Sequence, residues 1–312
     1  MTGQELKDIF SGSLFEGEAK FAEPMSNHTS LRMGGPADVY AIPSDALSLI
    51  SINLNLIKSN LPFFPLGGGT NVLVRDGGME GVVLSTRLFK KIKSLQEDSA
   101  SVLVSVEAGA LLLQLIHFAK ENGYSGIEGL AGIPGTVGGA IFGNAGAFGY
   151  EIKDVLTAVQ IMDAEDGIKT LSADAISFGY RSSDIPPGSV ILSAEMKLMK
   201  DKEESVAARV ENFLRMKRER QPLWEPSAGC VFKNPTGESA GKLIDAAGCK
   251  GARIGDVEVS SIHANFFINR GRAKASDFIR LMDIVSQRVK KRYGVILEPE
   301  IKIIGRDEVA EA

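Results

Sequence analysis

The sequence is poor in the residues that build metal centres and disulfide networks. It contains 2 cysteines and 3 histidines among 312 residues. The cysteines, Cys230 and Cys249, are not spaced as a C-x-x-C pair, and the histidines are scattered. Such a set supplies neither a zinc site nor a disulfide framework. We therefore expect a protein without a metal cofactor.

Long apolar runs and blocks of positive charge are also missing. The longest apolar stretch, ALLLQLIHFAK at 110–120, is interrupted by Gln114 and His117 and is too short to span a bilayer. Residues 1–20 lack the apolar core of a secretory signal. The formal net charge of −4 disfavours nucleic acid binding. We expect a cytoplasmic protein that binds neither membrane nor nucleic acid, and the sequence implies no oligomeric state.

Strand-like and helix-like segments alternate irregularly, which predicts an α+β fold rather than one doubly wound sheet. Short β-branched segments bounded by Gly, Pro or Asp predict strands at 38–43, 63–69, 71–75, 81–85, 101–109, 189–198, 264–269 and 294–305. Two further strands are expected in 159–171, around an Asp166-Gly167 turn. Apolar periodicity predicts helices at 110–123, at 201–220, from about 239, and from about 276 to Gly294.

Glycine is abundant, with 34 residues, and many of them fall in two clusters. The first is PLGGGTNVLV at 65–74, and the second lies at 126–149. Consecutive glycines let backbone N–H groups approach a ligand and form an anion-binding nest. The first cluster lacks the G-x-G-x-x-G spacing and, taken alone, also fits a tight turn between strands. Together the two clusters predict a dinucleotide that is held mainly by the main chain.

These clusters, with NHTSLRMGGPAD at 27–38, resemble the FAD-binding domain of the vanillyl-alcohol-oxidase (PCMH) type. Five later segments narrow the resemblance to the UDP-N-acetylenolpyruvoylglucosamine reductases of bacterial wall synthesis. They are FGYRSS at 178–183, SAGCVFKNP at 227–235, AGKLIDAAG at 240–248, VSSIHANFFIN at 259–269 and LEPEIKIIG at 297–305. The resemblance covers about residues 25–305.

The resemblance implies a two-subdomain FAD-binding fold followed by a C-terminal α+β substrate domain. We expect the subdomains at 1–88 and 89–203 and the substrate domain at 204–312, where the charged helix begins. A final strand near 295–305 would carry Glu300 back to the flavin site. The implied reaction uses NADPH and FAD to reduce UDP-N-acetylglucosamine enolpyruvate to UDP-N-acetylmuramate, a peptidoglycan precursor. NADPH and this substrate would use the same site in turn.

The resemblance also assigns residues to the cofactor. The expected FAD contacts lie in the two glycine clusters and are Gly67, Gly68, Gly69, Thr70, Asn71, Gly132, Ile133, Pro134, Gly135, Thr136, Gly138, Gly139, Asn144 and Ala145.

Three residues match the catalytic positions of the resembled family. Arg181 would contact the substrate carboxylate, which suits a guanidinium fork. Cys230, where many members have serine, would donate the proton, because a thiol is a better acid than a hydroxyl. Glu300 would support the carboxylate end of the intermediate, whereas Glu298 is expected at the surface. An ordinary salt-bridge arginine and a buried structural cysteine are the alternatives, and we assign the second to Cys249.

Substrate contacts are expected from Lys233, Asn234, Tyr180 and His263. His263 and Asn265 fit a core position equally well. Residues 182–198 are too short to hold the tyrosine-bearing loop of the larger subtype, so the chain resembles the compact subtype. Two other functions remain open, namely another FAD oxidoreductase of the superfamily and a non-catalytic flavin or UDP-sugar binding protein.

Overall fold

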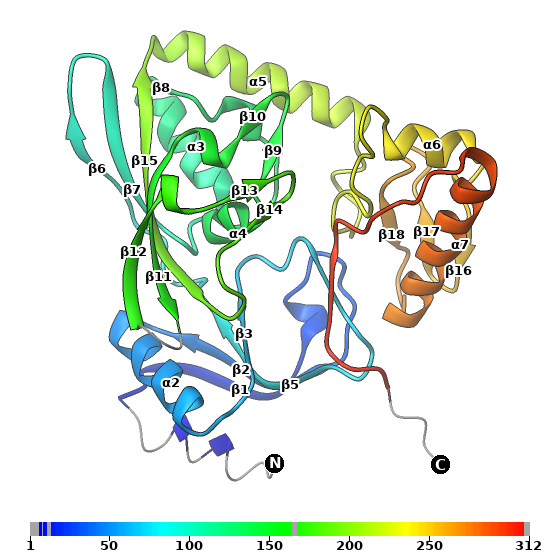
Figure 1. Cartoon of the computed structure of the whole chain (residues 1–312), viewed down its shortest axis with the longest axis horizontal. Helices are drawn as coiled ribbons and strands as arrows, with labels where there is room; N and C mark the ends of the chain where they lie inside the picture. The colour runs from blue at the N-terminus through cyan, green and yellow to red at the C-terminus, as the bar shows by residue number, and fades with distance from the viewer. Residues whose placement is uncertain (1–5, 8, 11–13, 164–166, 309–312) are drawn as a thin grey trace. The chain divides into compact units, whose positions relative to one another are not determined.

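The computed structural model describes residues 6–7, 9–10, 14–163 and 167–308. The chain divides by contact into two compact units (Figure 1). The first comprises residues 1–21, 39–68 and 81–216, and the second comprises residues 22–38, 69–80 and 217–312. Neither unit is continuous in sequence, so each is built from segments that lie far apart along the chain.

An antiparallel sheet of six strands forms the centre of the first unit. Its order is β12 (Gly167–Ser172), β11 (Leu156–Asp163), β15 (Val190–Lys200), β7 (Ser101–Glu107) and β6 (Ile92–Glu97), with β8 (Tyr124–Ser125) also on β15. The strand predicted at 189–198 is confirmed as β15, and its even-numbered residues from Val190 to Leu198 are buried. The pairing of β11 with β12 is also confirmed, whereas Asp166 of the predicted turn lies outside the described residues.

The first unit also contains helices and two short hairpins. Helices α3 (Leu112–Glu121) and α4 (Val137–Phe142) share the sheet's hydrophobic core, and α5 (Glu203–Arg220) follows β15. The 3-10 helices are η2 (Glu128–Leu130), η3 (Ile152–Asp154) and η4 (Ala173–Ala175). The hairpins are β9 (Gly146–Ala147) with β10 (Tyr150–Glu151) and β13 (Phe178–Gly179) with β14 (Ser182–Ser183). Gly123 follows α3 at φ +64°, as expected of a glycine that ends a helix.

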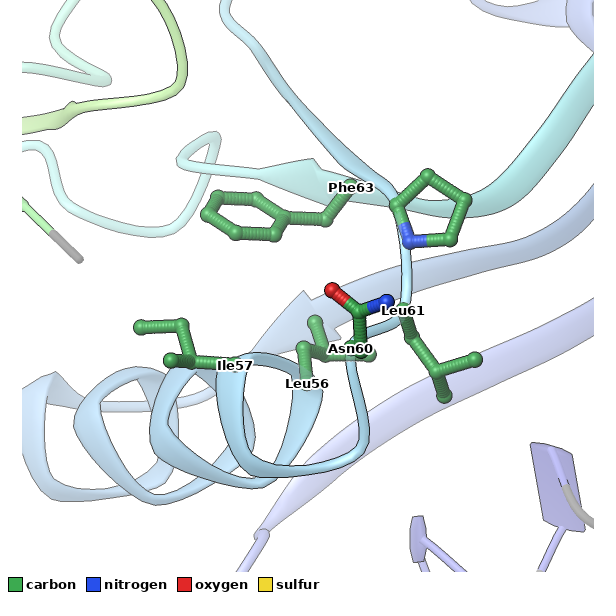
Figure 2. Close-up of a pocket in the computed structure, with 6 residues that line it drawn as sticks. Leu56, Ile57, Asn60, Leu61 and Phe63 are labelled. Atoms are coloured by element: carbon green, nitrogen blue, oxygen red, sulfur yellow. The ribbon is translucent and has the colours of Figure 1, made fainter.

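A smaller sheet has the order β1 (Gly17–Pro24), β2 (Pro36–Pro43), β5 (Met79–Ser85) and β3 (Phe63–Leu66). Helix α2 (Ala46–Lys58) accompanies it and was not predicted. The Asp45 side chain accepts a hydrogen bond from the Ser48 N–H at 2.7 Å and thereby caps the helix. Figure 2 shows the pocket where α2 ends, with Phe63 of β3 across from Ile57. None of the predicted site residues lines this pocket.

The second unit contains a three-stranded antiparallel sheet. Its order is β16 (Arg253–Ile254), β17 (Val257–Val259) and β18 (Phe267–Asn269). Its other elements are η1 (Met25–Asn27), α6 (Ala240–Ala246), α7 (Ala275–Tyr293) and the parallel pair β4 (Val72–Val74) and β19 (Lys302–Ile304). The stripe predicted for α7 is buried, and Gly294 ends the helix at φ +72°.

The final strand is shorter than predicted. Only Lys302–Ile304 of the expected range 294–305 forms a strand. Pro299 forms an isolated bridge with Phe232 instead. A proline has no N–H to give to a sheet, so it limits the strand at this point.

In the described part of the chain, no helix is both long and apolar enough to cross a membrane. The same residues contain no cluster of three His, Cys, Asp or Glu side chains that could hold a metal ion.

Candidate active site

The two glycine clusters touch each other in the first unit. A Cβ placed on Gly67 would lie 2.2 Å from Oγ1 of Thr136, and one on Gly68 would lie 3.0 Å from Cα of Gly135. Gly135 also has φ +118°, a conformation that favours glycine. The structure therefore brings together two loops that the sequence predicted to act as one site.

The second cluster is anchored to the sheet by its own backbone. Val137 N–H donates to the Ala110 carbonyl at 2.9 Å, and Gly138 N–H donates to that of Ala108 at 2.8 Å. Asn144 is fully buried, and its Oδ1 has no hydrogen-bond partner among the described residues. Close backbone approach without side chains, together with a buried acceptor, fits a ligand such as FAD that is held by the main chain.

The other predicted cofactor residues extend these loops. Ile133, Pro134 and Gly139 are partly or fully exposed on the second cluster, and Gly132 adopts φ +76° there. Ala145 follows Asn144 at the end of α4. Gly69, Thr70 and Asn71 belong to the second unit, where Gly69 has φ +61°.

An ion pair between the buried Glu128 and the partly exposed Arg209 lies at the start of the second cluster, and the sequence did not predict it. Glu128 accepts hydrogen bonds from the Gly126 N–H at 2.7 Å and from Nε and Nη2 of Arg209 at 2.9 and 2.8 Å. Arg209 Nη2 also donates to Asp201 at 2.6 Å. The hydrogen bond from Arg209 is the main cause that lowers the pKa of Asp201. No spacing pattern could reveal a partner 81 positions away.

Arg181 lies in the turn between β13 and β14 in the first unit. Its Nη2 donates to the Gly146 carbonyl at 2.7 Å, and its guanidinium lies 5.2 Å from the Tyr180 ring centroid. Its φ of +58° is a left-handed conformation, which costs a non-glycine residue on the order of 1 kcal/mol. Such strain gathers at functional sites, and here it accompanies the arginine that the sequence singled out.

Cys230 lies in the second unit on a loop that is held by the main chain. Val231 N–H donates to the Asn265 carbonyl at 2.8 Å. The Asn265 side chain accepts from the Phe232 N–H at 3.0 Å and donates to the Phe232 carbonyl at 2.7 Å. Cys230 is half-buried, whereas Cys249 is fully buried, and burial raises the pKa of its thiol. The burial of Cys249 agrees with the structural role expected for it, whereas the role of Cys230 stays a prediction.

Glu300 lies next to the Cys230 loop. Its N–H donates to the Val231 carbonyl at 2.8 Å, and its own carbonyl accepts from Nδ2 of Asn71 at 3.2 Å. The structure therefore brings Cys230, Glu300 and the end of the first glycine cluster onto neighbouring segments of the second unit. The link between them is made by backbone groups, which leave no trace in the sequence.

Two predicted substrate residues of the second unit have partners within the protein. Lys233 pairs through Nζ with Glu298 at 2.6 Å, and its N–H donates to the Glu298 carbonyl at 2.8 Å. Asn234 Oδ1 accepts from the Ala240 N–H at 3.0 Å at the start of α6. The ion pair gives Glu298 a contact that the surface interpretation did not include, although its side chain is 69% exposed.

His263 is partly buried against Phe266, with ring centroids 4.9 Å apart. The loss of water around the ring lowers the pKa of His263. Its Nδ1 accepts from the Asn265 N–H at 3.3 Å. His263 therefore contacts Asn265, and Asn265 in turn binds the backbone of the Cys230 loop at Phe232. A direct role of either in substrate binding stays a prediction.

Comparison with known proteins identifies the domains. The profile of the FAD binding domain family matches residues 37–172. The profile of the C-terminal domain of UDP-N-acetylenolpyruvoylglucosamine reductase matches residues 221–304. The predicted fold class, a PCMH-type FAD-binding domain followed by a C-terminal α+β domain, is thus confirmed.

Similar proteins cover nearly the whole chain. UDP-N-acetylenolpyruvoylglucosamine reductase of Geotalea uraniireducens is 40% identical over 291 residues, which are 93% of this chain and 95% of the relative. That of Syntrophus aciditrophicus is 38% identical over 304 residues, 97% and 96% of the two chains. The crystal structure of the Thermus caldophilus enzyme has a TM-score of 0.77 and 33% identity, and the match covers 93% of this chain and 99% of that one. The chain therefore belongs to the UDP-N-acetylenolpyruvoylglucosamine reductases, the flavoprotein oxidoreductases of peptidoglycan synthesis that are also called UDP-N-acetylmuramate dehydrogenases.

Proposed function

We propose that this protein uses NADPH and FAD to reduce UDP-N-acetylglucosamine enolpyruvate to UDP-N-acetylmuramate. The family membership supports the reaction. The observation that supports the residue assignment is the backbone hydrogen bond from Glu300 N–H to the Val231 carbonyl, which joins the Glu300 segment to the Cys230 loop. The same pairing would be unexpected if Cys230 and Glu300 matched the family by chance.

The glycine loops of the first unit would hold the cofactor, with Gly67, Gly68, Gly135 and Gly138 admitting it close to the backbone. FAD, when bound, supplies the hydride chemistry that links NADPH oxidation to reduction of the enolpyruvyl double bond. Glu128 and Arg209 would keep the second glycine loop in place while the cofactor is bound.

Arg181 would hold the substrate carboxylate and stabilise the negative charge that spreads onto it once a hydride has reached the alkene. The planar fork of a guanidinium also matches the two oxygens of a carboxylate. Cys230 would then give its thiol proton to the neighbouring carbon, and solvent would restore that proton. A thiol has an ordinary pKa of about 8.5 and is therefore protonated at neutral pH. Glu300 would support the carboxylate end.

Lys233, Asn234, Tyr180 and His263 would contact the substrate. The ion pair of Lys233 with Glu298 would hold the lysine in place until the diphosphate arrives. The short connection from β14 to β15 supports the compact subtype, without a tyrosine loop. We further infer that NADPH and substrate use one site in turn, so that excess substrate competes with NADPH. Binding of both at once would contradict this.

An anaerobic two-step titration tests the proposed function. NADPH is added to bleach the flavin absorbance, and UDP-N-acetylglucosamine enolpyruvate is then added to restore it. We expect full recovery with one UDP-N-acetylmuramate formed per flavin. A flavin that bleaches but does not recover would show that the substrate is wrong. Protein that lacks flavin is first loaded with FAD.

Two variants test Cys230 itself. Cys230→Ala should still be bleached by NADPH, but recovery should slow by about 10²–10⁴-fold, the usual contribution of a placed acid. Cys230→Ser should keep most of the recovery rate, because a hydroxyl can also carry the proton. Equal recovery in Cys230→Ala and the parent protein would exclude Cys230 as the donor.

A further inference from the structure

The hairpin of β9 and β10 contacts the Arg181 side chain. Gly146 and Glu151 are directly opposite each other in the hairpin register. The Gly146 carbonyl accepts the 2.7 Å hydrogen bond from Nη2 of Arg181. One end of the guanidinium is therefore fixed by main chain, on an element far from Arg181 in sequence.

Gly146 leaves a space that the side chains of Arg181 and Glu151 both border. A Cβ on Gly146 would lie 2.9 Å from Cγ of Glu151 and 3.3 Å from Nη1 of Arg181. Both side chains therefore pass on the same side of this glycine, and they carry opposite charges. The pKa of Glu151 is lowered, chiefly by its ion pair with Lys153, with smaller effects of Asn144 and the positive charge of Arg181. The carboxylate thus stays charged beside the guanidinium at neutral pH.

The hairpin is itself fastened to α5. Phe213 stacks on Phe148 with ring centroids 4.8 Å apart, and it meets Tyr150 edge-on at 5.7 Å. Asn144, which precedes the hairpin, donates through Nδ2 to the Gly179 carbonyl at 2.9 Å. The hairpin is therefore packed on α5, and the residue two positions before it is hydrogen-bonded to the strand that leads to Arg181.

We propose that the hairpin 146–151 is a seat for Arg181, in which the Gly146 carbonyl orients the guanidinium and Glu151 is its positioning residue. This inference rests on the proposed function, because Arg181 is taken to bind the substrate carboxylate. A long arginine side chain samples many rotamers, and a fixed carbonyl and a neighbouring carboxylate restrict them before substrate binds. Because a misplacement of about 1 Å can cost about 10²-fold in rate, such a seat affects catalysis without touching substrate.

Binding to the FAD-loaded, oxidised enzyme separates this role from a merely structural one. UDP-N-acetylmuramate carries the lactyl carboxylate, whereas UDP-N-acetylglucosamine lacks it. In Glu151→Gln, we expect the dissociation constant of the first ligand to rise by about 10-fold or more, since the guanidinium loses its position. That of the second should stay unchanged. Glu121→Gln is the matched control, because Glu121 is an exposed glutamate at the end of α3.

Kinetics and a double substitution complete the test. Flavin reduction by NADPH should be unchanged in Glu151→Gln, and reoxidation by the enolpyruvyl substrate should slow. In an Arg181→Lys background, Glu151→Gln should have almost no further effect, because residues that act through one another are not additive. Glu151→Asp keeps the charge and should recover part of the loss.

Three results would contradict the proposed role of the hairpin. They are an equal loss of affinity for both ligands, an unchanged rate of flavin reoxidation, or effects of Glu151→Gln and Arg181→Lys that are fully additive. If Glu151→Gln fails to fold, Glu151→Asp carries the same measurements. Failure of the proposed function would look different, because the parent protein itself would then not be reoxidised by the enolpyruvyl substrate.

Discussion

Replacing Arg209 with methionine leaves Glu128 buried with one of its three observed hydrogen-bond donors. The Glu128 side chain is 2% exposed, whereas that of Arg209 is 37% exposed. Breaking a fully buried ion pair by removing one partner costs about 3–5 kcal/mol. Water can reach the exposed part of Arg209, and this screening reduces the expected loss in unfolding free energy to about 2–3 kcal/mol.

Urea unfolding followed by circular dichroism measures this loss, with FAD affinity from flavin fluorescence as a second readout. The dissociation constant of FAD should rise, because the loop that begins at Gly126 loses its anchor. Arg209→Lys keeps the charge but not the two-pronged geometry, so its loss should be intermediate. Glu128→Leu combined with Arg209→Met should recover much of the stability. An Arg209→Met protein as stable as its parent, with the same FAD affinity, would refute the reasoning.

Three further predictions follow from individual contacts. Gly67→Ala should weaken FAD binding, because its methyl group would lie 2.2 Å from Oγ1 of Thr136. Gly143→Ala is the control and should not weaken it, because the nearest atom to its methyl group would be 3.5 Å away. Equal dissociation constants of FAD for the two variants, measured by flavin fluorescence titration, would contradict this. The Cys249 thiol should stay unmodified by Ellman's reagent at pH 8 until urea unfolds the protein, because burial shields it and raises its pKa; rapid modification of two thiols in the folded protein would exclude this. The pKa of His263 is lower in the folded than in the unfolded protein, so protons favour unfolding. Stability should therefore fall as pH drops below about 6.5, and His263→Gln should reduce that fall in urea titrations at pH 5–7.

The elements that the sequence predicted well carry their signals locally. Helix α7 combines a regular apolar stripe with a glycine at its end, and β15 alternates from Leu192 to Leu198. Helix α2 was missed because its serines, asparagines and isoleucines are weak helix formers. The Asp45 cap was the available signal. The strand expected at 294–305 is shorter in the structure because Pro299, in the middle of that range, cannot donate a hydrogen bond to a sheet.

Residue types in the site could be predicted, but their partners could not. The glycine clusters indicated main-chain binding of a dinucleotide, since many glycines together are costly without a ligand. Cys230 and Glu300 were assigned by resemblance, and only the fold shows that Val231 joins their segments. The carbonyl that accepts the hydrogen bond from Arg181 belongs to Gly146, 35 positions away. A backbone acceptor has no residue type, so no sequence pattern can point to it.

Helix α5 illustrates how far a local interpretation can fall short. Its charged composition indicated only a domain boundary, yet two of its residues reach separate parts of the candidate site. Arg209 binds Glu128 before the second glycine loop, and Phe213 packs on the hairpin that contacts Arg181. Residues four positions apart lie on one face of a helix, so a single rigid face fixes both parts at once. Helix α5 thus holds the predicted cofactor loop and the hairpin beside Arg181 in a fixed relation, as the proposed stabilisation of charge by Arg181 would require.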